Sequence, residues 1–352
     1  MPPKERVQGV LIVLKKSLLL LTLIVFLAGP ILNVPEAQAA SKSKKSHSVK
    51  SKRANSESKH KAKSKSIPTH TSQGDELDLR SSAALVVNQK SGAALYAKNT
   101  DIPSSIASIT KLMTAMVTLD AGLPLDEEIA ISEEDVDRLK FTGSRLALGT
   151  RLTREQLIHL ALIASENRAA AALSRAYPGG HTEFVAAMNR KALDIGMKDC
   201  HFVDGTGLNS DNRATAADLV KMVDAAYDYP LIRAITSMGT YDVSLPCTRV
   251  LHVRENGRVH KISRTEQCHM AFNNTNRLTR SKDWDIGVSK TGYINEAGHC
   301  LVMQTAIADQ EVIIVLLHSG GKEGRIGDAE RIRKWLEHDS RVATQRSLDT
   351  ST

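Results

Sequence analysis

The chain has 352 residues, 41% of them hydrophobic and 24% charged, a globular composition that excludes a fully disordered or fibrous protein. Its net charge of +8 is unevenly placed. Residues 1–66 hold 14 Lys and Arg against three Asp and Glu, which leaves 33 against 36 in residues 67–352. Because a nucleic-acid enzyme usually carries its positive charge on the folded part, this distribution disfavours a nucleic-acid partner.

The first 39 residues have the pattern of a signal peptide. Lysines and an arginine precede an apolar run over residues 18–28, and Ala37-Gln38-Ala39 forms a small-residue cleavage site. The run is shorter than the roughly 20 apolar residues of a membrane span. The alternative is an uncleaved N-terminal anchor, lengthened by residues 11–14. In both cases we expect an exported, periplasmic protein.

Residues 40–74 form a basic, Lys- and Ser-rich linker with almost no apolar side chains, so we expect them to be disordered. The lysines suit attachment to an anionic envelope surface. A solvated spacer is the open alternative, because each lysine near an anionic bilayer contributes only about 1 kcal/mol. A second disordered tail is expected over residues 339–352.

Between these segments, residues 75–338 are predicted to form one catalytic domain. A Lys-Ser-Gly turn joins two β-prone runs into a hairpin, helical stretches follow, and a strand meander and a helix close the domain. Two of the helices begin with a capping threonine. The predicted strands are 83–89, 93–98, 284–294, 299–307 and 312–318, and the predicted helices are 108–119, 153–164, 168–176, 182–195, 215–227 and 328–337.

This order of elements predicts an α+β fold. One antiparallel sheet is built from both ends of the domain and flanked by helices, and an all-helical subdomain spans about residues 120–245. A cleft is expected where the sheet and the subdomain meet, and ligand sites prefer such clefts.

Three motifs are expected at this cleft. The first is Ser108 with Lys111, at the start of an apolar helix, where residues three apart share a face. The second is Ser165 with Asn167, at the junction of two helical stretches. A competing Ser-x-Asn at residues 210–212 lies in a loop rich in Gly, Asn and Asp, which reads as the lead-in to the next helix.

The third motif is Lys290-Thr291-Gly292, inside a predicted strand. A glycine in a strand interior costs stability and usually marks the close approach of another backbone or a ligand. Each motif alone has an ordinary structural explanation, as a capped helix or an exposed strand. The occurrence of all three motifs in this order favours a single site that they share.

The three motifs resemble the active-site set of penicillin-recognising serine enzymes. The chain is most similar to the low-molecular-mass penicillin-binding proteins, of the D-alanyl-D-alanine endopeptidase type, with a β-lactamase/transpeptidase-like fold. The stretches that carry the resemblance are IASITKLMTAMV, SENRAAAAL, YPGG, TGLN…TAADL, NNTNRL and SKTGYINEAGHCLVM. The long Lys/Ser-rich tail departs from the family pattern.

The resemblance implies acyl transfer on peptidoglycan peptides, with β-lactam antibiotics as covalent inhibitors. A serine hydroxyl needs an adjacent base, and Lys111 serves only if its pKa falls from 10.4 toward about 7–8. Burial and repulsion from Lys290 would act in that direction. The roles implied are an oxyanion hole from the backbone N–H groups of Ser108 and Tyr293, proton relay by Ser165, and substrate orientation by Asn167, Lys290, Thr291 and Gly292.

Three other functions remain open at this stage. A class A β-lactamase would carry a Glu-x-x-Leu-Asn segment after the second motif, and none occurs between Asn167 and Lys290. A D,D-carboxypeptidase usually has a further β-domain, for which the 60 residues after Gly292 leave little room. The third is a non-catalytic envelope-binding protein.

The cysteines and histidines give weaker expectations. Cys247 and Cys268 flank a polar stretch and could close a loop by a disulfide, whereas Cys300 is expected to be a buried thiol. The histidines form no His-Glu-x-x-His or Cys/His cluster, so neither a metal nor a cofactor is expected. Glu166, beside the second motif, is expected to be a solvated carboxylate at a helix end.

Overall fold

The structure is a computed structural model, and its described residues are 77–255, 257–321 and 323–349. The predicted signal peptide (1–39) and linker (40–74) lie outside them. Within the described ranges, no helix has both the length and the apolar composition needed to cross a bilayer.

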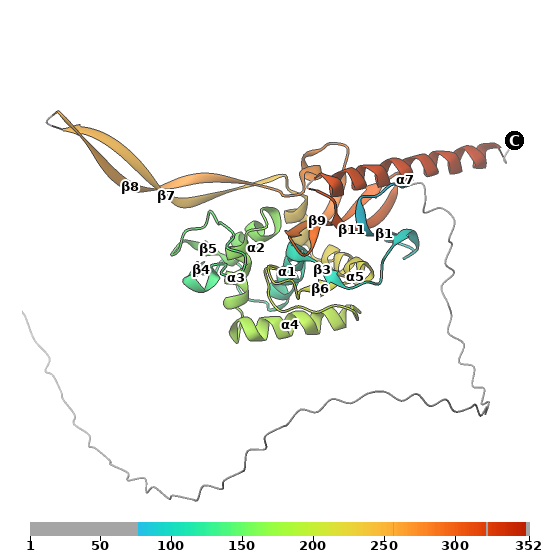
Figure 1. Cartoon of the computed structure of the whole chain (residues 1–352), viewed down its shortest axis with the longest axis horizontal. Helices are drawn as coiled ribbons and strands as arrows, with labels where there is room; N and C mark the ends of the chain where they lie inside the picture. Colours follow the sequence, from blue (N-terminus) through green and yellow to red (C-terminus); the bar gives the residue numbers. More distant parts are fainter. Residues whose placement is uncertain (1–76, 256, 322, 350–352) are drawn as a thin grey trace, which may run out of the picture. The chain divides into compact units, whose positions relative to one another are not determined.

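One five-stranded antiparallel sheet joins the two ends of the domain, as the sequence predicts (Figure 1). Its strands lie in the order β2-β1-β11-β10-β9. Strand β1 pairs with β11 from Ser81 opposite Ser319 to Asn88 opposite Val312, which ties the first hairpin to the last strand. The bounds are β1 Ser81–Asn88, β2 Ala94–Lys98, β9 Asp285–Ile294, β10 Gly298–Ile307 and β11 Gln310–Ser319.

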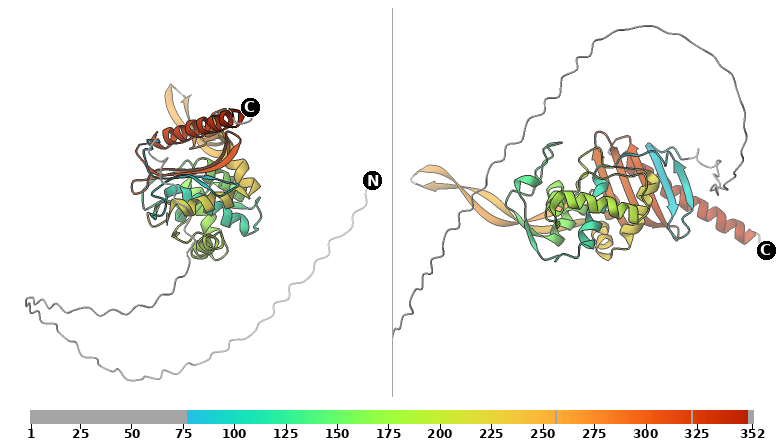
Figure 2. Two further views of the ribbon diagram at one scale, coloured as in Figure 1. Left: turned by 90° about the vertical axis from the view of Figure 1, so that its right-hand side faces the viewer. Right: turned by 90° about the horizontal axis from the view of Figure 1, so that it is seen from below.

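Both faces of this sheet are buried. Alternate side chains such as Val302 and Val315 join a core shared with the helices, whereas Leu301 and Ile314 join a second core with helix α7, Gly324–Asp349. Figure 2 shows α7 on one side of the sheet and the other helices on the opposite side. Burial on both faces explains why the last strands read as continuous apolar runs.

The other helices lie between the two sequence segments of the sheet. Thr153 caps α2 as predicted: its hydroxyl accepts from the Gln156 backbone N–H at 3.1 Å, and the Gln156 side chain accepts from the Thr153 N–H at 2.9 Å. The helices are α1 Thr110–Asp120, α2 Arg154–Ile163, α3 Asn167–Arg175, α4 Gly180–Asp194, α5 Ala216–Tyr227 and α6 Pro230–Ser237, with 3-10 turns η2 Ala107–Ile109, η3 Glu133–Asp135 and η4 Arg277–Arg280. Short strand pairs join β3 Ser104–Ser105 to β6 Arg213–Ala214 and β4 Glu128–Ala130 to β5 Arg151–Thr153.

Two segments differ from the expectation. The strands β7 (Thr240–Glu255) and β8 (Arg258–Asn273) form a long hairpin that the sequence analysis left unassigned, and β7 begins inside the predicted helical subdomain. Helix α7 continues to Asp349, so residues 339–349, expected in a disordered tail, are helical. Residues 338–349 contain no Gly or Pro to stop the helix, and propagation of a helix already formed costs little.

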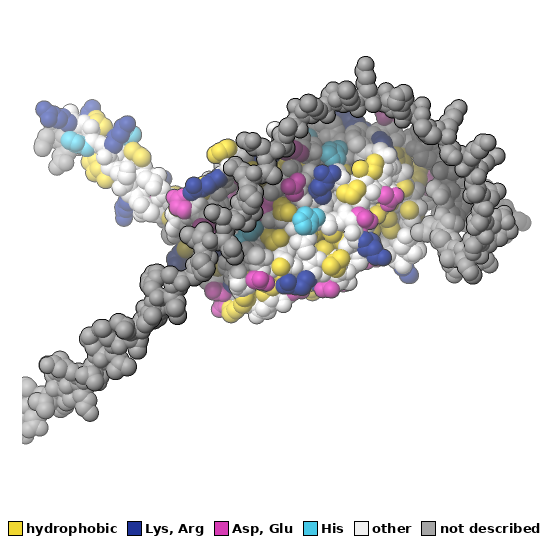
Figure 3. Space-filling view, turned by 60° about the horizontal axis from the view of Figure 1, so that its bottom comes forward, with side chains coloured by type: hydrophobic (Ala, Val, Ile, Leu, Met, Phe, Trp, Pro, Cys, Tyr) yellow, Lys and Arg dark blue, Asp and Glu magenta, His cyan; other side chains and the backbone are white. Residues whose placement is uncertain are grey.

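The β7–β8 hairpin extends away from the sheet and helices, and its root lies beside α2 (Figures 1 and 2). A disulfide between Cys247 and Cys268 joins its strands, so the bridge that the sequence allows is present, and Cys300 is a buried free thiol as expected. Basic, histidine and apolar side chains are exposed along the hairpin (Figure 3). The exposed apolar residues include Val250, Val259 and Ile262.

Candidate active site

Ser108 lies in the 3-10 turn η2, immediately before helix α1. The preceding residue, Ala107, has a φ of +49°, an uncommon conformation for a residue with a side chain. The Ala107 carbonyl accepts a hydrogen bond from the Thr110 hydroxyl at 2.8 Å, and Gly207 packs against it so closely that a Cβ there would overlap the carbonyl. The turn that presents Ser108 is therefore held from two sides.

Lys111 is fully buried one helical turn after Ser108. Its Nζ lies 2.9 Å from Ser108 Oγ, 2.8 Å from Asn167 Oδ1 and 2.6 Å from the Thr206 carbonyl oxygen. Burial lowers the pKa of Lys111 from 10.5 to about 7, although the carboxylates of Asp204, Glu166 and Asp137 act in the opposite direction.

These three partners suit Lys111 in both protonation states, because three oxygens can accept from an ammonium and a hydroxyl can instead donate to a neutral amine. A neutral amine has two N–H donors and one lone pair. The Thr206 carbonyl and Asn167 Oδ1 can only accept, so they take the two N–H groups. The lone pair then faces the Ser108 hydroxyl, which can donate its proton to it. This is the arrangement that a general base for Ser108 requires.

Ser165 connects α2 to α3 with a φ of +58°, a conformation that costs a non-glycine residue free energy and is common at functional sites. Its Oγ accepts a hydrogen bond from Lys290 Nζ at 2.9 Å. Lys290 is also buried, and burial, followed by the charges of Lys111 and Arg325, lowers its pKa well below 10.5. The expected repulsion between the two lysines thus acts on Lys290, while burial dominates at Lys111.

The third motif lies on β9 beside the turn that carries Ser108. A Cβ on Gly292 would lie 2.8 Å from the Ile106 carbonyl oxygen and 3.2 Å from the Ser108 backbone nitrogen. Gly292 therefore permits the close approach of two backbones that the sequence analysis expected. Thr291 Oγ1 donates to Thr275 Oγ1 at 2.7 Å, at the wall of the same cavity.

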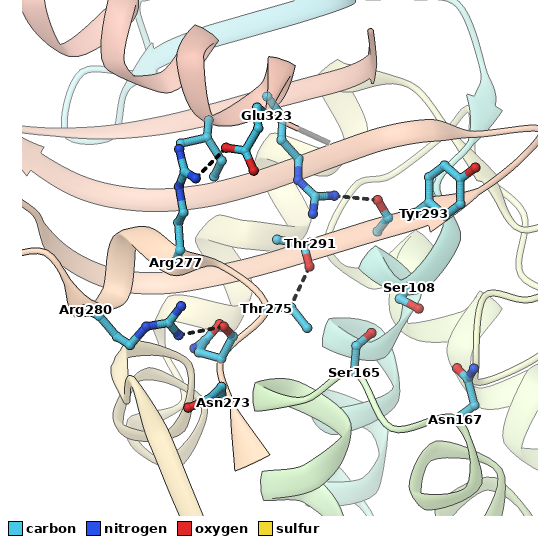
Figure 4. Close-up of a pocket in the computed structure, with 14 residues that line it drawn as sticks. Ser108, Ser165, Asn167, Asn273, Thr275, Arg277, Arg280, Thr291, Tyr293 and Glu323 are labelled. Carbon is cyan, nitrogen blue, oxygen red and sulfur yellow. Dashed lines mark hydrogen bonds and ion pairs between the residues drawn. The ribbon is translucent and has the colours of Figure 1, made fainter. Parts of the chain in front are cut away.

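The three motifs border one cavity of about 620 Å³ (Figure 4). In Figure 4, Ser108, Ser165 and Asn167 lie on one side of it, and Thr291 and Tyr293 come from the strand on the other. Tyr293 is 53% exposed, and its ring stacks on His299 with centroids 4.3 Å apart. The remaining lining residues are Asn273, Asn274, Thr275, Arg277, Arg280, Gly292, Glu323, Arg325 and Ile326.

The competing Ser-x-Asn has a structural role. Asn212 is fully buried, and its Oδ1 accepts from the backbone N–H groups of Val203 and Asp204 at 2.7 and 3.1 Å. Its Nδ2 donates to Thr110 Oγ1 at 3.1 Å. Asn212 thus supports the Lys111-bearing helix from behind, and Ser165-x-Asn167 is the pair that borders the cavity.

Sequence reasoning missed two groups at this site. The Thr206 carbonyl is a backbone atom, which no side-chain motif can reveal. Arg325, in the first turn of α7, is 8% exposed and donates to the carbonyls of Gly292 and Cys300 at 2.9 and 3.0 Å. Arg325 lines the cavity, so its positive charge suits an anionic group of a ligand.

Glu166 is less solvated than expected. It is half-buried at the N-terminal cap position of α3, and its carboxylate accepts a hydrogen bond from Ser144 Oγ. Its charge, together with the charges of Asp204 and Asp137, favours the protonated form of Lys111. These carboxylates therefore limit how far burial lowers the pKa of the lysine.

Comparison with known proteins gives a consistent result. A family model described as D-alanyl-D-alanine carboxypeptidase matches residues 68–320. The chain is 42% identical to a D-alanyl-D-alanine endopeptidase of Pseudomonas aeruginosa over 260 residues, which cover 74% of this chain and 78% of the relative. The expected resemblance is thereby confirmed.

Two solved structures are similar and confirm the transpeptidase-like fold. The Streptomyces K15 DD-transpeptidase has a TM-score of 0.63 and 27% identity, with 73% of this chain and 97% of that chain covered. Penicillin-binding protein D2 of Listeria monocytogenes, in its ampicillin-bound form, has a TM-score of 0.57 and 27% identity, with 73% and 96% covered.

Proposed function

Because the chain belongs to the D-alanyl-D-alanine carboxypeptidase family of serine peptidases, we propose that it hydrolyses D-alanyl peptide bonds of peptidoglycan through an acyl-enzyme on Ser108. The observation that carries this proposal is the 2.9 Å contact between Ser108 Oγ and Lys111 Nζ, together with a lysine pKa of about 7. Such a lysine is substantially neutral at physiological pH and can accept a proton.

In the proposed mechanism, Ser108 Oγ attacks the carbonyl carbon of a D-Ala residue while its proton passes to Lys111. The backbone N–H groups of Ser108 and Tyr293 would stabilise the resulting oxyanion, a contribution of about 3–4 kcal/mol for each donor. Collapse of the tetrahedral intermediate breaks the peptide bond, and the proton that Lys111 took from Ser108 passes through Ser165, hydrogen-bonded to Lys290, to the departing amine. Water then hydrolyses the ester and restores Ser108.

We further propose that Asn167, Thr291 and Arg325 hold the substrate, with Arg325 facing a carboxylate. A peptidoglycan stem peptide carries such carboxylates, and a β-lactam antibiotic carries one beside its reactive ring. The ampicillin-bound relative supports β-lactams as covalent inhibitors of this site.

Gly292→Ala is expected to slow acylation of Ser108 by a fluorescent penicillin and to destabilise the protein. The added Cβ would press on backbone atoms of Ile106 and Ser108, so β9 and η2 must separate. Such overpacking costs about 1–3 kcal/mol, which chemical denaturation measures. Gly320→Ala is the matched control, because its Cβ would meet nothing within 4 Å. Equal behaviour of the two variants would contradict the proposed role of Gly292.

For the bond cleaved, we propose an endopeptidase that opens D-Ala-diaminopimelate cross-links. The relative from Pseudomonas aeruginosa, named an endopeptidase, supports this assignment, whereas the name of the family model favours a carboxypeptidase that trims stem pentapeptides. Purified protein should convert cross-linked dimeric muropeptides to monomers faster than it removes the last D-Ala from monomeric pentapeptides, with products separated by mass. The opposite preference would establish the carboxypeptidase.

Export to the periplasm is part of the proposal. It is supported by the signal-peptide pattern in residues 1–39 and by the disulfide between Cys247 and Cys268, which suits an oxidising compartment. The basic linker, residues 40–74, is proposed to contact an anionic envelope surface through its lysines.

A further inference from the structure

The amide of Asn167 connects Lys111 to a loop outside the three motifs. Its Oδ1 accepts from Lys111 Nζ at 2.8 Å, and its Nδ2 donates to Thr142 Oγ1 at 2.9 Å. The Thr142 hydroxyl in turn donates to Asp137 Oδ2 at 2.7 Å. Four groups from three segments thus form one chain of hydrogen bonds that ends at the proposed general base.

Asp137 determines which groups donate and which accept along this series of hydrogen bonds. An ionised carboxylate can only accept hydrogen bonds, and Asp137 also accepts from the backbone N–H groups of Leu139, Lys140 and Thr142 at 2.8, 2.9 and 2.8 Å. Partial burial raises the pKa of Asp137, but these hydrogen bonds outweigh it and hold the pKa below its ordinary value. The hydroxyl proton of Thr142 is therefore committed to Asp137.

With its proton committed, the Thr142 hydroxyl offers Asn167 only a lone pair. Of the two ends of the Asn167 amide, only the NH₂ end can donate to that lone pair, and this hydrogen bond turns the amide oxygen toward Lys111. We propose that Thr142, held by Asp137, is a positioning residue that fixes the orientation of the Asn167 amide and thereby directs the lone pair of Lys111 to Ser108. This inference rests on the proposed acylation of Ser108.

The opposite amide orientation would disable the base. An N–H of Asn167 facing Lys111 would occupy the lone pair of the neutral amine, which the Ser108 proton needs. It would also remove an acceptor from the protonated amine, and loss of that acceptor disfavours the charged form. The rate of acylation should therefore fall, while the pKa that controls it moves to lower pH.

The charged groups that act on Lys111 are the carboxylates of Asp204, Glu166 and Asp137, and the neighbouring amine of Lys290 has its own pKa lowered by the charge of Lys111. None of these ionisable groups is removed when Thr142 is replaced by an apolar residue of similar size. The number of charges around Lys111 is therefore unchanged. A shift in the pH profile of such a variant then reports a change in the orientation of the Asn167 amide.

The test measures the second-order rate constant for acylation by a fluorescent penicillin as a function of pH, using the full chain. Thr142→Val is expected to lower the maximal rate constant about tenfold or more, because the hydrogen bond that orients the Asn167 amide is lost and the base is misdirected. The rise of the rate constant with pH, the acid limb of the profile, should lie at lower pH than in the wild type. Thr142→Ser, which keeps the hydroxyl, should restore both the rate and the limb.

Thr182→Val is the matched control, because Thr182 is exposed on helix α4 and should leave the profile unchanged. A Thr142→Val protein with the rate and acid limb of the wild type would overturn the inference, and so would a Thr142→Ser protein as slow as Thr142→Val. If wild-type protein is not acylated at Ser108 at all, the proposed function itself fails. A thermal melt of each variant separates these outcomes from misfolding.

Discussion

Ser108→Ala is expected to abolish covalent labelling by a penicillin while leaving the fold intact. Ser108 Oγ lies 2.9 Å from Nζ of Lys111, whose pKa is about 7, and an alanine offers no atom that can form the ester. Labelling is measured by the mass of the intact protein after incubation with benzylpenicillin, where wild-type protein gains one equivalent. Circular dichroism of the same samples reports the fold.

Ser237→Ala serves as the matched control for that experiment. Ser237 ends helix α6, its hydroxyl donates to the Ala234 carbonyl, and it lies on an exposed part of the surface. This variant should label like the wild type. Persistent labelling of the Ser108→Ala protein would place the nucleophile elsewhere and remove the basis for the proposed mechanism.

Lys111→Met should lower the rate constant for acylation by about 10²–10⁴-fold, the range that a positioned general base contributes. In the wild type the amine must be neutral to accept the Ser108 proton, so the rate constant should rise with pH through an acid limb near pH 7. Methionine fills a similar volume without an ionisable group, and the limb near pH 7 should disappear. A stopped-flow pH series with a chromogenic cephalosporin measures both effects, and a variant that keeps the limb would assign it to another group.

The low pKa of Lys111 also makes the free energy of unfolding depend on pH. The pKa of Lys111 is about 7 in the folded protein against 10.5 for an ordinary lysine, so between these values the unfolded chain binds one more proton. The free energy of unfolding should therefore rise as pH increases from about 7 to about 10, and this rise should be smaller in Lys111→Met. Denaturant titrations at several pH values test the difference.

Much of the site is readable from the sequence because its groups are close along the chain. Ser108 and Lys111 are one helical turn apart, so local helix geometry alone brings them together. A glycine inside a strand, as in the third motif, indicates the close approach of another backbone or a ligand. The order of hairpin, helices and meander similarly places both ends of the domain in one sheet.

What the sequence does not reveal depends on contacts between distant segments. The Thr206 carbonyl meets Lys111 across 95 residues, and as a backbone atom it leaves no side-chain signature. Thr142 reaches Asn167 from a loop that has no motif, and Arg325 reaches the cavity from a helix beyond the last strand. Each is placed by tertiary packing, which single-sequence patterns do not encode.

The long hairpin escaped notice for a different reason. Toward the tip, residues 248–254 and 258–265 are exposed on both faces, so this half of the hairpin lacks the alternation of buried and solvated side chains by which a strand is usually recognised. The signal that could have found it is Asn256-Gly257 between two β-prone runs, since this dipeptide favours a tight hairpin turn. Gly257 has a φ of +79°, as such a turn requires.

The redox state of Cys247 and Cys268 in the hairpin reports which compartment the chain has entered. Thiols kept in the cytoplasm stay reduced, so molecules that never left the cell interior would carry two alkylatable sulfurs at these positions, whereas delivered molecules would carry none. Cys200 and Cys300 remain thiols in either population and supply an internal standard. The ratio of the two chemical forms in a cell extract thus tests the proposed export to the periplasm.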